Sequence, residues 1–229
     1  LLGFIGAHEW HKKGIDIPQL DGKIHVPFGV FSPLRGEYLD LIAQAPLAPN
    51  IQTAFDIGTG SGVIAAILAK RGIPDIIATD TNPKAIACAT ANLERLGLDK
   101  AVSIQSIDLF PESCADLIVC NPPWLPAKPT SAIETALYDP NHAMLTAFLN
   151  GVRQHLNPNG EAWLIISDLA EHLHLRNKDF LNQCFQTASL NVVDILKTKP
   201  QHKKAIDESD PLAFARNKET TYLYRLKAI

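Results

Sequence analysis

The loop at residues 56–62 has the composition of a nucleotide-binding turn. It reads Asp-Ile-Gly-Thr-Gly-Ser-Gly, follows a short apolar stretch and opens a helical one. Glycines let a backbone turn sharply and approach a ligand without a Cβ clash, although a plain strand-to-helix turn has the same composition. A dinucleotide fingerprint would need its third glycine at Val63, which disfavours that class. No Lys-Ser/Thr pair follows the glycines, so the loop is not a P-loop.

The tetrapeptide Asn121-Pro122-Pro123-Trp124 is the most specific motif in the chain. It directly follows the apolar run 117–120. Two prolines can neither continue a strand nor sit inside a regular helix, so they fix a rigid corner. At the carboxyl edge of a parallel sheet, that corner would present the Asn121 carboxamide and the Pro122 carbonyl to a ligand. Trp124 would offer a flat apolar face beside them.

Two acidic residues follow other apolar stretches. Asp80 comes after 76–79, and a carboxylate there can accept hydrogen bonds from both hydroxyls of a ribose lying across the strand ends. Asp108 comes after 102–105 and could accept a hydrogen bond from an adenine amino group. Taken alone, Asp108 is better interpreted as an ordinary loop acid. Asn82 is better placed than Asp80 to cap the next helix.

The elements that must position these residues alternate between strands and helices. Apolar runs predict seven strands, at 53–57, 76–79, 102–105, 117–120, 162–166, 192–196 and 221–226. Periodic stretches predict helices at 61–71, 83–96, 139–156 and 171–187, with a turn at 157–160. Continuous apolar strands between amphipathic helices call for a parallel sheet covered on both faces. We therefore predict an α/β fold with an open, doubly wound, Rossmann-like and mostly parallel sheet.

Residues 1–45 differ from the rest of the chain. Asp21-Gly22 separates 15–20 from 23–28, which predicts a hairpin with a type I′ turn, and a short helix is expected at 36–45. A length of 229 residues fits one large domain, or one domain with an appendage. We predict an N-terminal appendage at 1–45 and a main domain at 46–229. The chain starts with Leu1 and its sole methionine is Met144, so we expect 1–45 to be the remnant of a longer N-terminal domain.

Composition narrows the function classes. The formal charge of −3 argues against a protein that grips nucleic acid over its whole surface. The longest apolar run, 63–69, is too short to span a membrane, and no signal peptide is recognised. The four cysteines show no CxxC spacing, which favours a reduced, cytoplasmic setting. His8-Glu9-Trp10-His11 lacks metal-binding spacing, so no metal is expected. The loop 197–219 has a basic run and is either solvated or a substrate-binding flap.

Together, the glycine loop, Asp80, Asp108 and the Asn-Pro-Pro-Trp corner resemble class I S-adenosylmethionine-dependent methyltransferases. More narrowly, they resemble enzymes with an (Asn/Asp)-Pro-Pro-(Tyr/Phe/Trp) motif that methylate amino groups. Among these are the HemK-like release-factor glutamine methyltransferases, the adenine-N6 enzymes and the small-domain rRNA guanine enzymes. The resemblance extends from Pro33 to Leu226. It is loose at 32–37, where HemK-like enzymes have Pro-Arg-Pro-x-Thr-Glu, and Trp124 replaces their Tyr.

The resemblance implies that S-adenosyl-L-methionine is the cofactor and that a methyl group passes to a planar amide or exocyclic amino nitrogen. A protein glutamine is the favoured acceptor, within a release-factor-like partner; an RNA or DNA base is the alternative. A non-catalytic cofactor-binding scaffold is the competing hypothesis from another class, and a nicotinamide oxidoreductase ranks third. The catalytic residues implied are Asn121, Pro122 and Trp124. The cofactor-binding residues implied are Asp56, Gly58, Thr59, Gly60, Gly62, Asp80, Thr81, Asp108, Leu109 and Asn121.

The weak nucleophilicity of an amide or amino nitrogen explains why such a corner suits it as a methyl acceptor. The lone pair of an amide or aromatic amine is delocalised and weakly nucleophilic. Two carbonyl oxygens, on the Asn121 side chain and the Pro122 backbone, can accept its two N–H groups and stabilise positive charge as it develops. Trp124 could stack on the planar group and hold it in line. The nitrogen proton becomes acidic after transfer, so no strong general base is expected.

Overall fold

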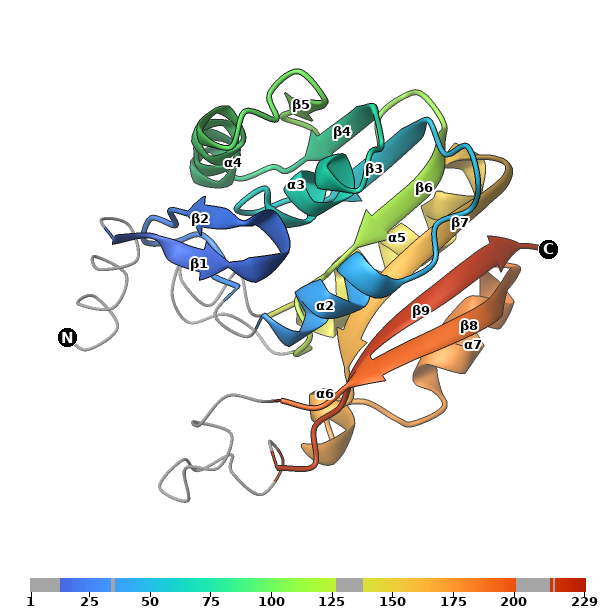
Figure 1. Ribbon diagram of the computed structural model, residues 1–229. Coiled ribbons are helices and arrows are strands. Elements are labelled where there is room, and N and C mark those ends of the chain that lie inside the picture. The colour runs from blue at the N-terminus through green and yellow to red at the C-terminus, as the bar shows by residue number, and fades with distance from the viewer. Residues whose placement is uncertain (1–12, 34–35, 127–137, 201–214, 216) are drawn as a thin grey trace.

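The computed structural model describes residues 13–33, 36–126, 138–200, 215 and 217–229 (Figure 1). Its main sheet has seven strands in the order β5-β4-β3-β6-β7-β9-β8. The strands are β3 (Thr53–Ile57), β4 (Asp75–Thr79), β5 (Val102–Gln105), β6 (Ala115–Cys120), β7 (Leu156–Ser167), β8 (Leu190–Thr198) and β9 (Thr221–Ala228). The α-helices are α2 (Glu37–Gln44), α3 (Val63–Lys70), α4 (Pro83–Arg95), α5 (Ala143–His155), α6 (Leu169–His172) and α7 (Phe180–Thr187).

The sheet is mostly parallel, as the sequence predicts. Strands β5, β4, β3, β6 and β7 run parallel to one another. Strand β9 is antiparallel to both β7 and β8. The order places β3 between β4 and β6, where the chain reverses its direction of winding. Ligands bind outside the carboxyl ends of strands at such a switch point, so the topology itself marks where to look for a site.

Two apolar layers cover the sheet, because successive side chains of a strand point to opposite faces. Ala54 of β3 packs in one layer with α2, α3 and Leu93 of α4. Its neighbour Phe55 packs in the other layer with α5 and α7. Figure 1 shows α2 and α3 on one side of the sheet and α5 on the other. The continuous apolar runs in the sequence therefore correspond to strands buried on both faces.

The N-terminal hairpin forms, but its predicted turn is wrong. Strands β1 (Ile15–Ile17) and β2 (Gly22–Ile24) pair with Ile17 opposite Gly22, so the connection is the four residues 18–21. A 3-10 turn, η1 (Pro18–Leu20), occupies it, and Asp21 has a left-handed φ of 52°. Because Pro18 has no N–H to donate to the strand ladder, β1 ends at Ile17. Gly22, expected in a type I′ turn, belongs to a strand instead.

Helix α2, the helix predicted at 36–45, packs on α3, β8 and β9. Hairpin residues such as Leu20 and Ile24 lie in the same apolar layer as α3. The N-terminal segment thus shares a core with the rest of the chain, and the boundary at 45/46 stays a prediction.

Two other predicted elements are wrong. The helix expected over 171–187 is two helices, α6 and α7, separated by a connection in which His174 has a φ of 58°. The turn expected at 157–160 is the irregular start of β7. There Leu156 pairs with Ala115 and Glu161 with Leu117, so the partner strands skip by different numbers of residues. The Asn-Pro-Asn-Gly segment therefore lies within β7 as an irregularity of the β6–β7 ladder and does not form a separate turn.

Some expectations concern residues that the structure does not describe. These are the segment His8–His11, part of the stretch 32–37 and most of the loop 197–219. Cys88, Cys114, Cys120 and Cys184 are all unbridged, and Cys88 and Cys120 are buried as expected. Among the described helices, none combines the length and apolar character needed to cross a membrane. The cytoplasmic setting stays a prediction.

Candidate active site

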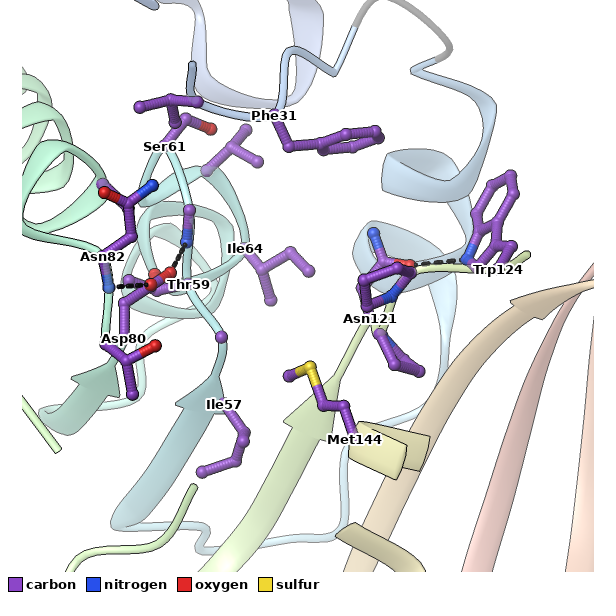
Figure 2. Close-up of a pocket in the computed structure, with 18 of the residues that line it drawn as sticks. Phe31, Ile57, Thr59, Ser61, Ile64, Asp80, Asn82, Asn121, Trp124 and Met144 are labelled. Carbon is purple, nitrogen blue, oxygen red and sulfur yellow. Dashed lines mark hydrogen bonds between the residues drawn. The ribbon is translucent and has the colours of Figure 1, made fainter. Parts of the chain in front are cut away.

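A cleft of about 540 Å³ lies at the carboxyl ends of β3, β4 and β6 (Figure 2). It gathers most of the residues that the sequence analysis singled out. The predicted residues that line it are Gly58, Thr59, Gly60, Asp80, Thr81, Asp108, Leu109, Asn121, Pro122 and Trp124. Asp56 and Gly62 do not line it. The two motifs, about sixty residues apart in sequence, therefore face one cavity.

The glycine loop is shaped by two close approaches. Thr59 donates its backbone N–H to the Thr79 carbonyl at 2.8 Å, which fixes the loop to the end of β4. Gly58 has a φ of 69°, and a Cβ there would lie 2.6 Å from the Met144 Cε. Gly62 has a φ of 81°, and its Cβ would lie 3.0 Å from the Ala89 Cβ on α4. The missing side chain at Gly58 leaves room for Met144 beside the cavity, and the missing side chain at Gly62 lets the start of α3 pack on α4.

Asp56 supports the loop from below instead of contacting the cleft. Its side chain is fully buried, and its Oδ2 accepts hydrogen bonds from the Thr59 hydroxyl at 2.6 Å and the Ala65 N–H at 3.0 Å. Oδ1 has no hydrogen-bond partner among the described residues. Burial raises the pKa of Asp56 to about 7, with a smaller contribution from the Asp80 charge, although the two hydrogen bonds oppose the rise. The prediction that Asp56 binds cofactor directly is therefore corrected to a structural role, and the same holds for Gly62.

Asp80 is held in place at the cleft by both of its oxygens. Oδ2 accepts the Gly60 N–H at 3.0 Å and Oδ1 accepts the Asn82 N–H at 2.9 Å (Figure 2). Asn82 in turn caps α4 by accepting the Lys84 N–H at 3.0 Å, as expected. A carboxylate oxygen can accept more than one hydrogen bond, so each oxygen keeps capacity for a ligand hydroxyl.

The turn that holds Asp108 is anchored through its neighbour. The Thr79 hydroxyl donates to the Leu109 carbonyl at 2.7 Å. Leu109 has a φ of 55°, in the left-handed region that a branched side chain rarely adopts. Such a conformation costs about 1–2 kcal/mol and persists only where the surroundings enforce it. The hydrogen bond from β4 supplies that enforcement and places Asp108 and Leu109 at the cleft.

The Asn-Pro-Pro-Trp corner has a hydrogen bond of its own. The Trp124 indole Nε1–H donates to the Asn121 Oδ1 at 2.9 Å (Figure 2). The Trp124 ring also meets the Tyr38 ring edge to face, with centroids 6.4 Å apart and an interplanar angle of 85°. Trp124 is therefore more than a stacking face, because it also contacts the carboxamide.

Several lining residues were missed by the sequence analysis. Phe31 lies across the cleft from Asn121, and Met144 from α5 closes another side (Figure 2). Tyr38 of α2 also lines the cleft. The segment around Gly29 is tied to α4 by the Asn82 side chain, which donates to the Gly29 carbonyl at 3.4 Å. Tyr38 stands on the buried face of an amphipathic helix, where sequence alone suggests only core packing. The loose match at 32–37 was the one signal that this segment borders the site.

Comparison with known proteins places the chain in a family. The model of the family "Methyltransferase small domain" matches residues 23–195. The chain belongs to this family. Among its curated relatives is a release factor glutamine methyltransferase from Cereibacter sphaeroides, 35% identical over 140 residues, covering 55% of this chain and 50% of that protein.

A second curated relative acts, by name, on RNA. It is a tRNA1(Val) (adenine(37)-N6)-methyltransferase from Cytophaga hutchinsonii, 35% identical over 134 residues, covering 55% of this chain and 56% of that protein. The chain thus spans about half the length of the curated relatives it matches. The crystal structure of a ribosomal protein L11 methylase from Lactobacillus delbrueckii subsp. bulgaricus has the same fold, with a TM-score of 0.60, 18% identity and coverage of 96% and 92%.

Proposed function

We propose that the chain is an S-adenosyl-L-methionine-dependent N-methyltransferase whose acceptor is a planar amide or amino nitrogen, foremost a protein glutamine. One observation carries the proposal. The Asn121-Pro122 corner and the glycine loop with Asp80 face the same cleft. A cofactor held by the second group would therefore lie beside an acceptor held by the first.

The residues of the cleft fit the cofactor. Gly58 and Gly60 bring bare backbone to the cavity surface, and a Cβ at Gly58 would intrude on Met144. Asp80 presents a carboxylate with remaining acceptor capacity, which suits a pair of ribose hydroxyls. Asp108 and Leu109 border the same cavity at the end of β5, where an adenine would be reached. These residues would hold S-adenosyl-L-methionine.

When bound, this cofactor supplies an electrophilic methyl group whose carbon–sulfur bond breaks, with the electron pair kept by sulfur, as the acceptor nitrogen's lone pair forms the new bond. The chain's own residues act on the acceptor. Asn121 Oδ1 and the Pro122 carbonyl would accept its N–H groups and stabilise the positive charge that develops on nitrogen. The proton released afterwards can pass to water. Phe31 and Trp124 would exclude solvent from the cleft and orient the planar group.

A protein acceptor is favoured by the release factor glutamine methyltransferase among the relatives and by the net charge of −3. A glutamine within an extended segment of a release-factor-like protein would reach the corner without the unstacking that a paired base requires. The second candidate is an adenine amino group in RNA. The tRNA methyltransferase relative and the aromatic residues Phe31, Tyr38 and Trp124 around the cleft favour it.

The test is transfer of a tritiated methyl group from S-adenosyl-L-methionine into an extract of a strain that lacks the protein. Digestion of the labelled product with protease or with nuclease then separates the two candidates. Label released by protease and recovered as N-methylglutamine would support the proposal. Label released only by nuclease would move the assignment to RNA or DNA. Binding of the cofactor with no transfer to any macromolecule would instead favour a scaffold module.

A further inference from the structure

We propose that Asn92 is a positioning residue for cofactor binding, which acts by holding an N-terminal strap against the glycine loop. The strap is the segment 25–32, which follows β2, and its residues 29–32 line the cleft. Asn92 lies inside α4, is 1% exposed and does not itself line the cleft. The proposal rests on the proposed function, because the place of the strap matters to methyl transfer only if S-adenosyl-L-methionine occupies the cleft.

The Asn92 carboxamide pairs with residue 25 as a neighbouring strand would. Its Oδ1 accepts the His25 backbone N–H at 2.8 Å, and its Nδ2 donates to the His25 carbonyl at 3.1 Å. A carboxamide carries the same donor and acceptor groups as a peptide bond, so it can replace a strand partner where β2 has ended at Ile24. The direction in which the strap leaves the hairpin is therefore set by α4.

The same side chain also reaches the glycine loop. The Asn92 Nδ2 donates to the Ser61 carbonyl at 3.0 Å, and Ser61 lines the cleft. A peptide N–H at one end and two carbonyls at the other match a single orientation of the carboxamide. One buried side chain thus joins the strap to the loop, although the two are far apart in the sequence.

A second asparagine of α4 holds the strap nearer to the cleft. Asn82 donates from its side chain to the Gly29 carbonyl at 3.4 Å, while its backbone N–H donates to the Asp80 carboxylate. Around this contact the strap makes a turn in which the Val30 N–H donates to the Pro27 carbonyl at 3.3 Å. The strap is therefore bonded to α4 at two points, one on each side of Pro27.

These hydrogen bonds set the course of the strap more than its burial does. Val26 is buried in the same apolar layer as α3 and keeps the strap on the domain, but apolar contacts are not directional. The bonds from α4 fix where the strap runs, and Phe31 faces the cleft (Figure 2). A cavity wall that is fixed before the ligand arrives needs less ordering on binding. We therefore expect Asn92 to strengthen cofactor binding through the strap.

The substitution Asn92→Asp tests this role, because it keeps the shape and an Oδ acceptor but removes both donors. We expect the Kd of S-adenosyl-L-methionine, measured by calorimetry, to rise roughly tenfold, with kcat at saturating cofactor within about twofold of wild type. Arg95→Ala is the matched control. Arg95 donates to the Asn92 Oδ1 at 2.9 Å and does not line the cleft, so its loss leaves the bonds from Asn92 to strap and loop intact. This variant should keep the wild-type Kd.

A double-mutant cycle shows whether Asn92 acts through the strap. Phe31→Ala removes the aromatic side chain of the strap from the cleft and should itself weaken cofactor binding. In that background Asn92→Asp should raise the Kd less than about threefold, because a displaced strap has less contact left to lose. An Asn92→Asp effect of the same size in both backgrounds would overturn the proposal, since Asn92 would then act only through the glycine loop or through stability.

Hydrogen exchange followed by mass spectrometry adds a readout that needs no turnover. In the cofactor-free Asn92→Asp variant, exchange in the segment 25–32 should become at least about tenfold faster, while β3 and β6 keep their protection. A general loss of stability would instead speed exchange throughout the domain. In the wild-type chain, S-adenosyl-L-methionine should slow exchange in the strap as well as in the glycine loop. This wild-type measurement decides the matter even if Asn92→Asp fails to fold.

Two further results would overturn the role of Asn92. One is an unchanged Kd in a folded Asn92→Asp variant, and the other is a strap whose exchange the cofactor does not slow. Failure of the proposed function would look different. The wild-type chain would then bind S-adenosyl-L-methionine and transfer no methyl group, while the Kd and the exchange rates would still show whether Asn92 supports binding.

Discussion

The two sides of the cleft are built by different means. On the cofactor side, strand-to-helix turns are held by bonds between neighbouring strands, such as Thr59 N–H to Thr79 carbonyl and Gly60 N–H to Asp80 carboxylate. On the acceptor side, the contacts join side chains, within the motif as between Trp124 and Asn121, and also across the chain. Tyr38 of α2 meets Trp124 after β6. Backbone geometry shapes the first side, and side-chain chemistry shapes the second.

This difference separates general from specific function. A side built from backbone tolerates changes of many side chains while it binds the same ligand. A side built from a few distant side chains changes its ligand when one of them changes. Two of the curated relatives act, by name, on different acceptors, a release factor glutamine in one case and a tRNA adenine in the other. Substitutions on each side should therefore affect different quantities.

The largest effect is expected from Asn121→Ala on the acceptor side. Loss of the carboxamide removes one of two carbonyl acceptors for the nitrogen in the transition state. We expect kcat to fall roughly 10²- to 10³-fold, while the affinity for S-adenosyl-L-methionine stays within a few fold. A methyl-transfer assay and calorimetry measure the two quantities. Asn191→Ala, on the exposed part of edge strand β8, is the control and should behave as wild type.

Near-normal turnover in Asn121→Ala would contradict the claim that side-chain chemistry shapes the acceptor side, because catalysis would then not depend on this side chain. A parallel loss of affinity for S-adenosyl-L-methionine would also count against the separation of the two sides, since one residue would then serve both.

The same division explains what could be predicted from the sequence. Strands β3 and β5 were predicted with their observed limits. Strand β3 is a mostly buried run that ends just before Gly58, and β5 alternates Val102 and Ile104 with polar residues. Asp80 and the glycines were found because each directly follows a strand. The cofactor side is local in sequence, and local patterns predict it.

The misses have physical causes that lie outside local patterns. Tyr38 looks like a core residue of an amphipathic helix, and only the packing of α2 brings it to Trp124. The break between α6 and α7 is stabilised by Arg176, which donates to the Ser167 carbonyl and to Glu171. That buried arginine overrides the helical periodicity. Asp56 was assigned to the ligand because of its motif, whereas its burial depends on how α3 folds back over β3.

An intermediate effect is expected from Asp80→Ala on the cofactor side. It removes a charged acceptor for the ribose and also releases the Gly60 and Asn82 N–H groups. We expect S-adenosyl-L-methionine to bind roughly 10- to 100-fold more weakly, with kcat at saturating cofactor changed far less. Asp75→Ala, at the opposite end of β4 and exposed, is the matched control. An unchanged Kd in Asp80→Ala would show that the ribose lies elsewhere.

The last effect is on stability and not on catalysis, and is expected from Asp56→Asn beneath the cofactor side. The folded chain holds the Asp56 proton up to about pH 7, whereas an ordinary aspartate releases it near 3.8. Between these values the folded state binds the proton more tightly than the unfolded state. The stabilisation is therefore complete below the lower value, and rising pH removes it until about pH 7. The asparagine variant lacks this dependence and should gain stability relative to wild type by about 1.4 kcal/mol per pH unit across that window.

Urea unfolding at pH 5, 6, 7 and 8 measures the gain. The difference between Asp56→Asn and wild type should rise through pH 7 and then level off, because Asp56 is ionised in both states above it. A difference that does not vary with pH would mean that the carboxylate is already ionised in the folded chain at pH 5. The Thr59 hydroxyl and the Ala65 N–H would then outweigh its burial. That outcome would make charge, and not backbone geometry alone, a structural support of the cofactor side.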